Sequence, residues 1–153
     1  MVLPLPEGSG GTISPKAVRE ILAFIDKRKV TVVALGPGFG HNSGISKLVN
    51  KILSVEKIAV VLDADGLNAI SKNDLKKARA ALIITPHPGE MSKLTGRTIE
   101  DIQNTRESAA KRFASETGTV CVLKGNGTVV SHDLSGLIFL SEKLAFYFGS
   151  LLD

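Results

Sequence analysis

The sequence has very few of the residues that define several common protein classes. It contains one cysteine, Cys121, one tyrosine and no tryptophan. A single cysteine excludes an internal disulfide and a zinc site built from cysteines, and it fits a reducing compartment. No apolar stretch approaches the roughly 20 residues that a membrane-spanning helix needs. We therefore expect neither a disulfide scaffold nor a membrane-spanning helix.

Patterns for secretion and for nucleic-acid binding are missing as well. Residues 1–7 contain no basic segment followed by an apolar one, so they do not form a secretory signal, and cytoplasm is the expected location. The net charge of +4 comes from scattered basic residues. With little aromatic surface to stack on bases, we expect no nucleic-acid partner. The charge fits a mildly basic surface or an anionic ligand such as a nucleotide.

The composition that remains is typical of a folded domain, with 43% hydrophobic and 22% charged residues in a chain of 153. Short apolar runs alternate with segments of helical periodicity. The expected strands are residues 30–35, 58–62, 81–85 and 119–123, followed by a pair at 128–131 and 137–140. The expected helices begin after Ser14, near Ser43 and at Thr98, where Asp101 completes a capping box for one long helix.

This alternation predicts an α/β fold with a mostly parallel sheet sandwiched by helices and joined by right-handed crossovers. A β-hairpin region is expected near the C-terminal end. Every unusual polar or glycine cluster directly follows a predicted strand, at residues 36–40, 63–66, 85–90 and 124–128. Ligands of open α/β sheets bind at the carboxyl ends of strands, so the four clusters predict one binding crevice. The alternative is that loops are polar and rich in glycine in any case.

The first cluster, Gly36-Pro37-Gly38-Phe39-Gly40, lets a backbone approach a ligand closely and leads into a helix N-terminus that suits an anion. It matches neither the dinucleotide-binding fingerprint, since Gly44 comes one residue too late, nor a P-loop. A tight strand-to-helix turn explains it equally well. In the second cluster, Asp63 and Asp65 have three open roles: magnesium binding, ribose binding, or bonding to the next helix and loop.

In the third cluster two prolines fix the backbone around His87, which sets the direction of its side chain. Glu90 lies in the first turn of the next helix, where it favours the helix dipole or holds a hydrated magnesium ion. In the fourth cluster Lys124 stands beside flexible glycines, as a phosphate contact would. The alternative is a hairpin turn at Asn126-Gly127 with a solvated lysine.

The remaining polar candidates have ordinary explanations. Cys121 alternates with valines inside a predicted strand, so we expect a small core residue. His41 and His132 are expected at the surface or in loops, not as metal ligands.

Together the four clusters resemble the ADP- or ATP-dependent NAD(P)H-hydrate dehydratase family, a branch of the ribokinase-like fold. They stand in the family's order over roughly residues 3–140. The strings that carry the resemblance are Gly36 to Gly40, Val61 to Asn68, Thr85 to Met91 and Val122 to Thr128.

The resemblance implies repair of hydrated NADH or NADPH: ADP or ATP phosphorylates the added hydroxyl, and phosphate then leaves. It implies that hydrated NAD(P)H binds at Gly38, Gly40, Asp65 and His87. It implies that Glu90 lies near Mg²⁺. The nucleotide is expected at the fourth cluster, which consists of Lys124, Gly125, Asn126, Gly127 and Thr128. Family members are often oligomers, so the resemblance also implies a homo-oligomer.

Two segments of the family pattern are not found in the sequence. The family has a further βα portion before the equivalent of Leu3, and a Gly-Gly-x-Gly-Asp segment beyond Leu140 whose aspartate is the catalytic base. We therefore expect residues 1–153 to be one partial domain, incomplete at both ends, and we assign no catalytic residue. A ribokinase-like vitamin or sugar kinase and a non-catalytic nucleotide-binding remnant stay open as alternatives.

Overall fold

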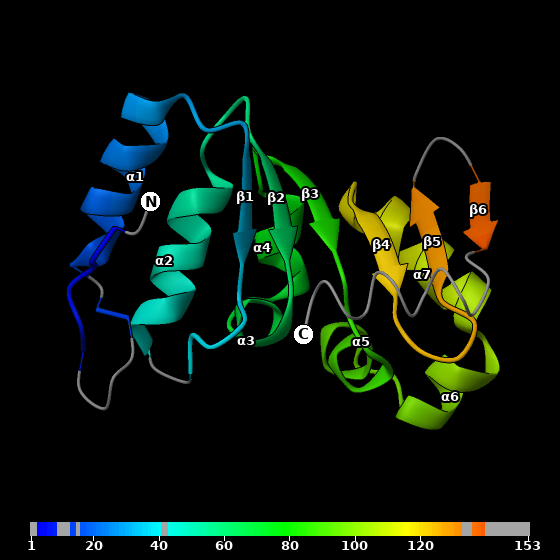
Figure 1. Cartoon of the computed structure of the whole chain (residues 1–153). Helices are drawn as coiled ribbons and strands as arrows, with labels where there is room; N and C mark the ends of the chain where they lie inside the picture. The colour runs from blue at the N-terminus through cyan, green and yellow to red at the C-terminus, as the bar shows by residue number, and fades with distance from the viewer. Residues whose placement is uncertain (1–2, 9–12, 15, 41–42, 133–135, 140–153) are drawn as a thin grey trace.

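The computed structural model describes residues 3–8, 13–14, 16–40, 43–132 and 136–139 (Figure 1). They form helices and strands in alternation. The strands are β1 (Val32–Leu35), β2 (Ala59–Leu62), β3 (Ala81–Ile84), β4 (Val120–Leu123), β5 (Val129–His132) and β6 (Gly136–Phe139). The helices are α1 (Ala17–Arg28), α2 (Ser43–Leu53), α3 (Ala64–Asn68), α4 (Lys72–Lys76), α5 (Pro88–Thr95), α6 (Ile99–Asn104) and α7 (Arg106–Thr117).

All six strands form one sheet in the order of the chain. Neighbours from β1 to β4 pair in parallel, whereas β5 and β6 are antiparallel additions. The predicted α/β fold with a mostly parallel sheet and a C-terminal hairpin region is thereby confirmed. Since each parallel strand pairs with the next one along the chain, right-handed crossovers put all the connecting helices on the same face.

Burial differs sharply between the two faces of this sheet. Leu35, Leu62, Ile84 and Cys121 occupy one register row and are all buried against the helices. The row one residue earlier faces the other way and is at least partly exposed throughout: Ala34, Val61, Ile83 and Val120. Within the described residues, the helices therefore cover one face far more completely than the other, where the sequence pattern predicted a sheet covered on both faces.

Two helices differ from the sequence prediction. The expected long helix after Thr98 is divided into α6 and α7 at Thr105, whose φ of −131° is not helical. The Thr105 hydroxyl donates to the Asp101 carbonyl and accepts from Arg97, and these bonds hold the break. A second short helix, α4, follows α3. Ser71 and Asp74 form a full capping box at its start, which the spacing of the two residues could have predicted.

Among the described residues, no helix combines the length and the apolar character that a membrane span requires.

Candidate functional site

The four predicted clusters lie at the carboxyl ends of β1 to β4, which meet at the lower edge of the sheet in Figure 1. They are called here the first loop (36–40), the second loop (63–66), the third loop (85–90) and the fourth loop (124–128). Hydrogen bonds between these loops hold the edge together.

The first and second loops contact each other through backbone. Gly36 has a φ of +130°, and a Cβ there would lie 1.8 Å from the Asp63 carbonyl oxygen, so only glycine fits. Asp65 accepts a hydrogen bond of 2.9 Å from the Gly40 backbone N–H. Gly38 differs, because its φ of +76° favours glycine but a Cβ would meet nothing within 4 Å. The space in front of Gly38 is open to a ligand.

The second and fourth loops are joined by an ion pair. Lys124 Nζ lies 2.8 Å from Asp63 Oδ1, and the Asp63 side chain is only 6% exposed. Asp63 stands at the N-cap position of α3, yet its side chain makes no capping bond. Of the three roles open for the aspartates, the structure shows loop bonding: Asp63 holds Lys124, and Asp65 holds Gly40.

The third loop is a capping box around His87. His87 Nδ1 accepts hydrogen bonds from the backbone N–H groups of Gly89 and Glu90, and Glu90 Oε2 accepts one from the backbone N–H of His87. A Cβ at Gly89 would lie 2.8 Å from the imidazole, so this glycine allows the ring its position. With Nδ1 as acceptor, the neutral imidazole carries its proton on Nε2, and the side chain is 57% exposed.

The fourth loop connects β4 to β5 as a hairpin. Leu123 pairs with Val129, so five residues form the connection instead of a two-residue Asn126-Gly127 turn. Asn126 is not among the residues with positive φ, which a type I′ turn would require. The Lys124 backbone N–H donates to the Pro86 carbonyl at 2.9 Å and thereby attaches this loop to the third.

The sequence interpretation missed Arg106, the first residue of α7. Its guanidinium donates to the carbonyl oxygens of Leu123, Lys124 and Gly127, at distances from Nη2 of 3.0, 3.1 and 3.2 Å. Burial lowers the pKa of the Arg106 guanidinium. No local pattern marks this residue, because its partners lie about twenty positions further along the chain.

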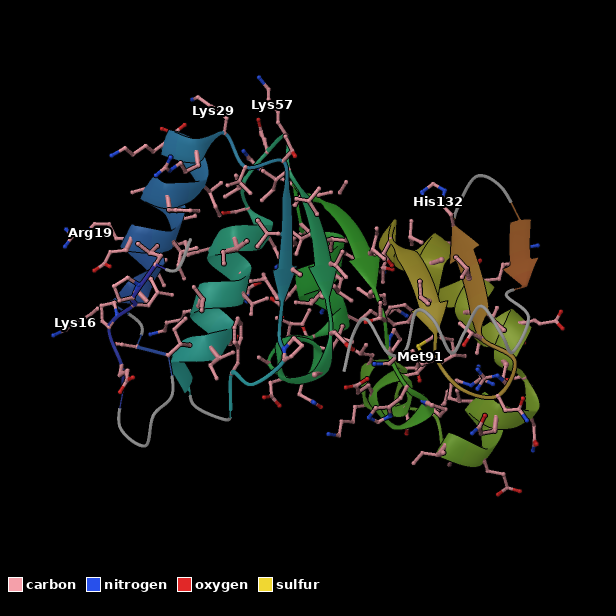
Figure 2. The ribbon with its side chains drawn as sticks, in the orientation of Figure 1. Lys16, Arg19, Lys29, Lys57, Met91 and His132 are labelled. Carbon is pink, nitrogen blue, oxygen red and sulfur yellow. The ribbon has the colours of Figure 1, made fainter. Side chains whose placement is uncertain are left out.

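The remaining sequence candidates lie away from the edge or inside the core. Cys121 is fully buried in β4, and burial raises the pKa of its thiol to about 12, which confirms a core residue. Figure 2 shows His132 at the opposite edge of the sheet from the four loops, and the labelled side chains of Lys16 and Arg19, at the start of α1, point outward. His41 lies outside the described residues.

The donor set limits how a metal ion could bind. The described residues contain no group of three or more His, Cys, Asp or Glu side chains placed to hold one. Glu90 is 5% exposed and already bonded to His87, although it lines a hollow of about 450 Å³ between α3, α4 and α5. Mg²⁺ at nucleotide sites keeps several waters and uses one or two carboxylates together with phosphates. These residues fit a hydrated ion carried by a nucleotide and not a dedicated protein cage.

Comparison with known proteins gives a consistent result. The family model described as NAD(P)H-hydrate dehydratase matches residues 11–143. A bifunctional NAD(P)H-hydrate repair enzyme from Moorella thermoacetica is 36% identical over 133 residues, which are 86% of this chain and 25% of that protein. The ADP-dependent (S)-NAD(P)H-hydrate dehydratase of Bacillus subtilis is 36% identical over 99 residues, 65% of this chain and 34% of that one.

Solved structures agree in fold. A Bacillus subtilis ADP/ATP-dependent NAD(P)H-hydrate dehydratase, co-crystallised with ATP/Mg²⁺, matches with a TM-score of 0.63 and 33% identity over 71% of this chain and 38% of that one. A ribokinase-like protein of Enterococcus faecalis matches in fold alone, with a TM-score of 0.65 at 18% identity over 80% of this chain and 43% of that one. The chain spans about a quarter of the length of the first of these relatives.

Proposed function

Since the chain belongs to the NAD(P)H-hydrate dehydratase family, we propose that it takes part in the nucleotide-dependent dehydration of hydrated NADH or NADPH. The added hydroxyl of the nicotinamide ring is phosphorylated by ADP or ATP, and phosphate is then eliminated. Phosphoryl transfer depends on positioning and on stabilisation of negative charge, which loops and backbone N–H groups can supply.

The observation that carries this proposal is the joining of the four loops along one sheet edge. Asp65 connects the first and second loops, Asp63 connects the second and fourth, and the Pro86 carbonyl connects the third and fourth. A ligand on the first three loops and a nucleotide on the fourth would therefore lie side by side, as transfer between them requires.

On the substrate side we propose Gly38, Gly40, Asp65 and His87 as the contacts. The open space at Gly38 allows a ligand to approach the backbone closely. Asp65 holds Gly40 in place by accepting a hydrogen bond from its backbone N–H. The capping box uses Nδ1 of His87 as acceptor, and Nε2 lies 3.6 Å from Glu90 Oε1. We propose that Nε2–H turns from this carboxylate to donate to the substrate. The geometry of the capping box is set before the ligand arrives, which lowers the entropic cost of binding.

On the nucleotide side we propose Lys124, Gly125, Asn126, Gly127 and Thr128. Lys124 Nζ supplies a positive charge that pairs with Asp63, and the lysine side chain is 30% exposed. A phosphate would compete with Asp63 for this ammonium group. Glu90 is proposed to meet Mg²⁺ through water, and the ion, when bound with the nucleotide, supplies charge neutralisation on the phosphates.

The setting of this reaction is also part of the proposal. We infer a cytoplasmic location, because a chain with one free cysteine fits a reducing compartment. The partners are hydrated NAD(P)H and ADP or ATP, with no nucleic acid or membrane, and further copies of the chain form a homo-oligomer.

The test is an assay of hydrated NADH with ADP or ATP and Mg²⁺ that follows the return of reduced nicotinamide absorbance. The wild-type chain is compared with Lys124→Ala and with Lys111→Ala, an exposed lysine of α7 that serves as a matched control. Turnover that Lys124→Ala loses and Lys111→Ala keeps is the expected result. A stable phosphorylated product without elimination would instead indicate a kinase.

A thermal melt with and without nucleotide separates binding from chemistry. A ligand at 100 times its Kd stabilises a fold by about 2.7 kcal/mol, which shifts the melting temperature measurably. A shift without any turnover would indicate a non-catalytic nucleotide-binding protein. No shift with ADP or ATP would overturn the nucleotide site itself.

A further inference from the structure

We propose that Arg106 is a positioning residue for nucleotide binding: it holds the fourth loop so that backbone N–H groups of that loop face the phosphates. This inference rests on the proposed function of the fourth loop as a nucleotide site. Arg106 itself lies behind the loop, at the start of α7, and touches no nucleotide in this account.

Most contacts of Arg106 are backbone carbonyls at the end of β4 and in the fourth loop. Nη2 reaches three of them, and Nε adds a longer contact of 3.4 Å to the Gly127 carbonyl. Nη1 donates to Gln103 Oε1 at 2.8 Å. A guanidinium has five N–H donors in a rigid plane, and here they are directed at protein acceptors. The guanidinium of Arg106 is therefore engaged by acceptors of the protein itself.

Close packing shows that the loop is shaped around this side chain. Gly125 has a φ of +138°, and a Cβ at this position would lie 3.0 Å from Nη1 and 3.1 Å from Nη2 of Arg106. The glycine is therefore required both by its backbone angle and by the guanidinium that lies against it. Gly127, with a φ of +71°, has open space instead. The loop is packed tightly on its Arg106 side at Gly125.

Peptide geometry then directs the N–H groups to the other side. In a trans peptide the carbonyl of one residue and the N–H of the next point in opposite directions, and no cis peptide occurs among the described residues. Because the carbonyls of Lys124 and Gly127 point at Arg106, the N–H groups of Gly125 and Thr128 point away from it. The described residues give neither N–H a backbone acceptor. Outward N–H groups of this kind form an anion-binding concavity.

The backbone N–H of Lys124 tests this peptide geometry, because its hydrogen-bond acceptor is present in the structure. The Leu123 carbonyl points at Arg106, and the Lys124 N–H points away, where it meets the Pro86 carbonyl. Arg106 thus also determines how the fourth loop attaches to the third loop. A lysine at position 106 would keep the charge, but one ammonium group cannot serve three carbonyls in the same plane.

The first experiment needs no nucleotide. Amide hydrogen exchange and amide chemical shifts of residues 124–128 are measured in wild type, Arg106→Lys and Arg106→Ala. The matched control is Arg112→Ala, an exposed arginine on the same helix that pairs with Glu116. We expect both Arg106 variants to alter this loop while the amides of α7 stay protected. Unchanged loop amides in Arg106→Ala would overturn the inference whether or not the chain binds nucleotide.

The second experiment measures Kd for ADP and ATP with Mg²⁺. We expect about tenfold weaker binding or more in Arg106→Lys and Arg106→Ala, since hydrogen bonds to a charged group are lost. Millimolar guanidinium should restore binding by Arg106→Ala, and methylammonium should not. The salt dependence of binding should stay as in wild type, but it should fall in Lys124→Ala, which loses a charge at the phosphate.

The outcomes separate two claims: that the fourth loop binds a nucleotide, and that Arg106 positions this loop. Absence of nucleotide binding by the wild-type chain overturns the proposed function, while the loop amides still decide the role of Arg106. Full binding by Arg106→Lys, or a salt dependence that falls as in Lys124→Ala, would show that Arg106 acts through its charge and overturn the positioning role. If Arg106→Ala does not fold, Arg106→Lys, which keeps the charge, decides the inference through the same loop amides and the same Kd.

Discussion

The first and second loops are held together differently from the third and fourth. The first two meet by close packing of backbone, where Gly36 fits against the Asp63 carbonyl, with one side-chain bond from Asp65 to Gly40. In the other two, polar bonds shape each loop, namely the His87 capping box and the bonds of Arg106, and the Lys124 N–H donates to the Pro86 carbonyl between them. One ion pair, between Lys124 and Asp63, joins the two halves.

This difference teaches that one sheet edge can be made rigid by two kinds of interaction. Packing against backbone is insensitive to charge and salt but tolerates no added atom. Polar bonds tolerate changes of shape but fail when one partner is removed. Substitutions that act on only one kind of interaction should therefore separate the two halves.

The largest effect is expected from Gly36→Ala. The new methyl group would lie 1.8 Å from the Asp63 carbonyl oxygen, and φ of +130° is strained for any L residue. We expect a loss of about 4 kcal/mol in the free energy of unfolding, which combines overpacking and backbone strain. Gly38→Ala is the matched control, and it should cost only about 1 kcal/mol because its methyl group meets open space. Urea unfolding of both variants measures this, and equal losses would refute packing as the cause.

The second-largest effect is expected at the ion pair between Lys124 and Asp63, which joins the first and second loops to the third and fourth. Lys124→Met leaves the Asp63 carboxylate buried without its cation, and we expect a loss of roughly 2 kcal/mol. Asp63→Asn in the same chain should recover much of that loss, because the buried charge is then absent. A double-mutant cycle from denaturant unfolding measures the coupling. Additive losses would show that the two loops are not coupled through this pair.

Much of this edge could be predicted from the sequence because the signals are local. The strands were visible as short β-branched runs, and the four clusters stood directly after them. His87, Gly89 and Glu90 lie within four residues, so their capping box depends on local spacing alone. The order of clusters and strands was enough to predict that they share one edge, since parallel strands end together.

The parts that could not be predicted depend on contacts distant in the chain. Asp63 and Lys124 are 61 residues apart, and no spacing rule connects them. Arg106 looked like an ordinary surface charge in a helix, because its acceptors are backbone carbonyls that the sequence does not mark. The break at Thr105 is different, because the bonds that hold it come from the nearby Arg97 and Asp101. The apolar periodicity continues across it and therefore predicts one long helix.

The sequence also fails to predict how unequally the described helices cover the two faces of the sheet. Each strand is rich in apolar residues on both faces, which predicts burial on both sides. Which face the described helices cover is decided by strand order. Because β1 to β4 follow one another in the sheet, successive crossovers fall on one side, and Val32 on the other face is 57% exposed.

A smaller effect is expected at the hydrogen bond that Asp65 accepts from Gly40, which joins the first loop to the second. Asp65→Ala removes the acceptor for the Gly40 N–H and should cost about 1 kcal/mol. Asp65→Asn keeps an oxygen acceptor and should cost less than half as much. Amide exchange at Gly40 should rise in the alanine variant only. If both variants lose the same stability, the charge of Asp65 matters and not its hydrogen bond.

The smallest effect is expected far from the edge, where Glu116 joins α7 to α4. Hydrogen bonds from Arg112 and then from Lys72 lower the pKa of Glu116 to about 2. A carboxyl group whose pKa is lower in the folded state stabilises the fold above its unfolded pKa, here 4.5, and loses that contribution as pH falls towards 2. Glu116→Gln should therefore reduce the slope of stability against pH in this window, while Glu107→Gln, an exposed glutamate of the same helix, should not.

The same variant also tests how local the effect of Arg106 is. Glu116 lies on the helix that carries Arg106 but outside the four loops, so Glu116→Gln should leave the amides of the fourth loop unchanged. A change in those amides would show that the fourth loop depends on the whole of α7 and not on Arg106 alone.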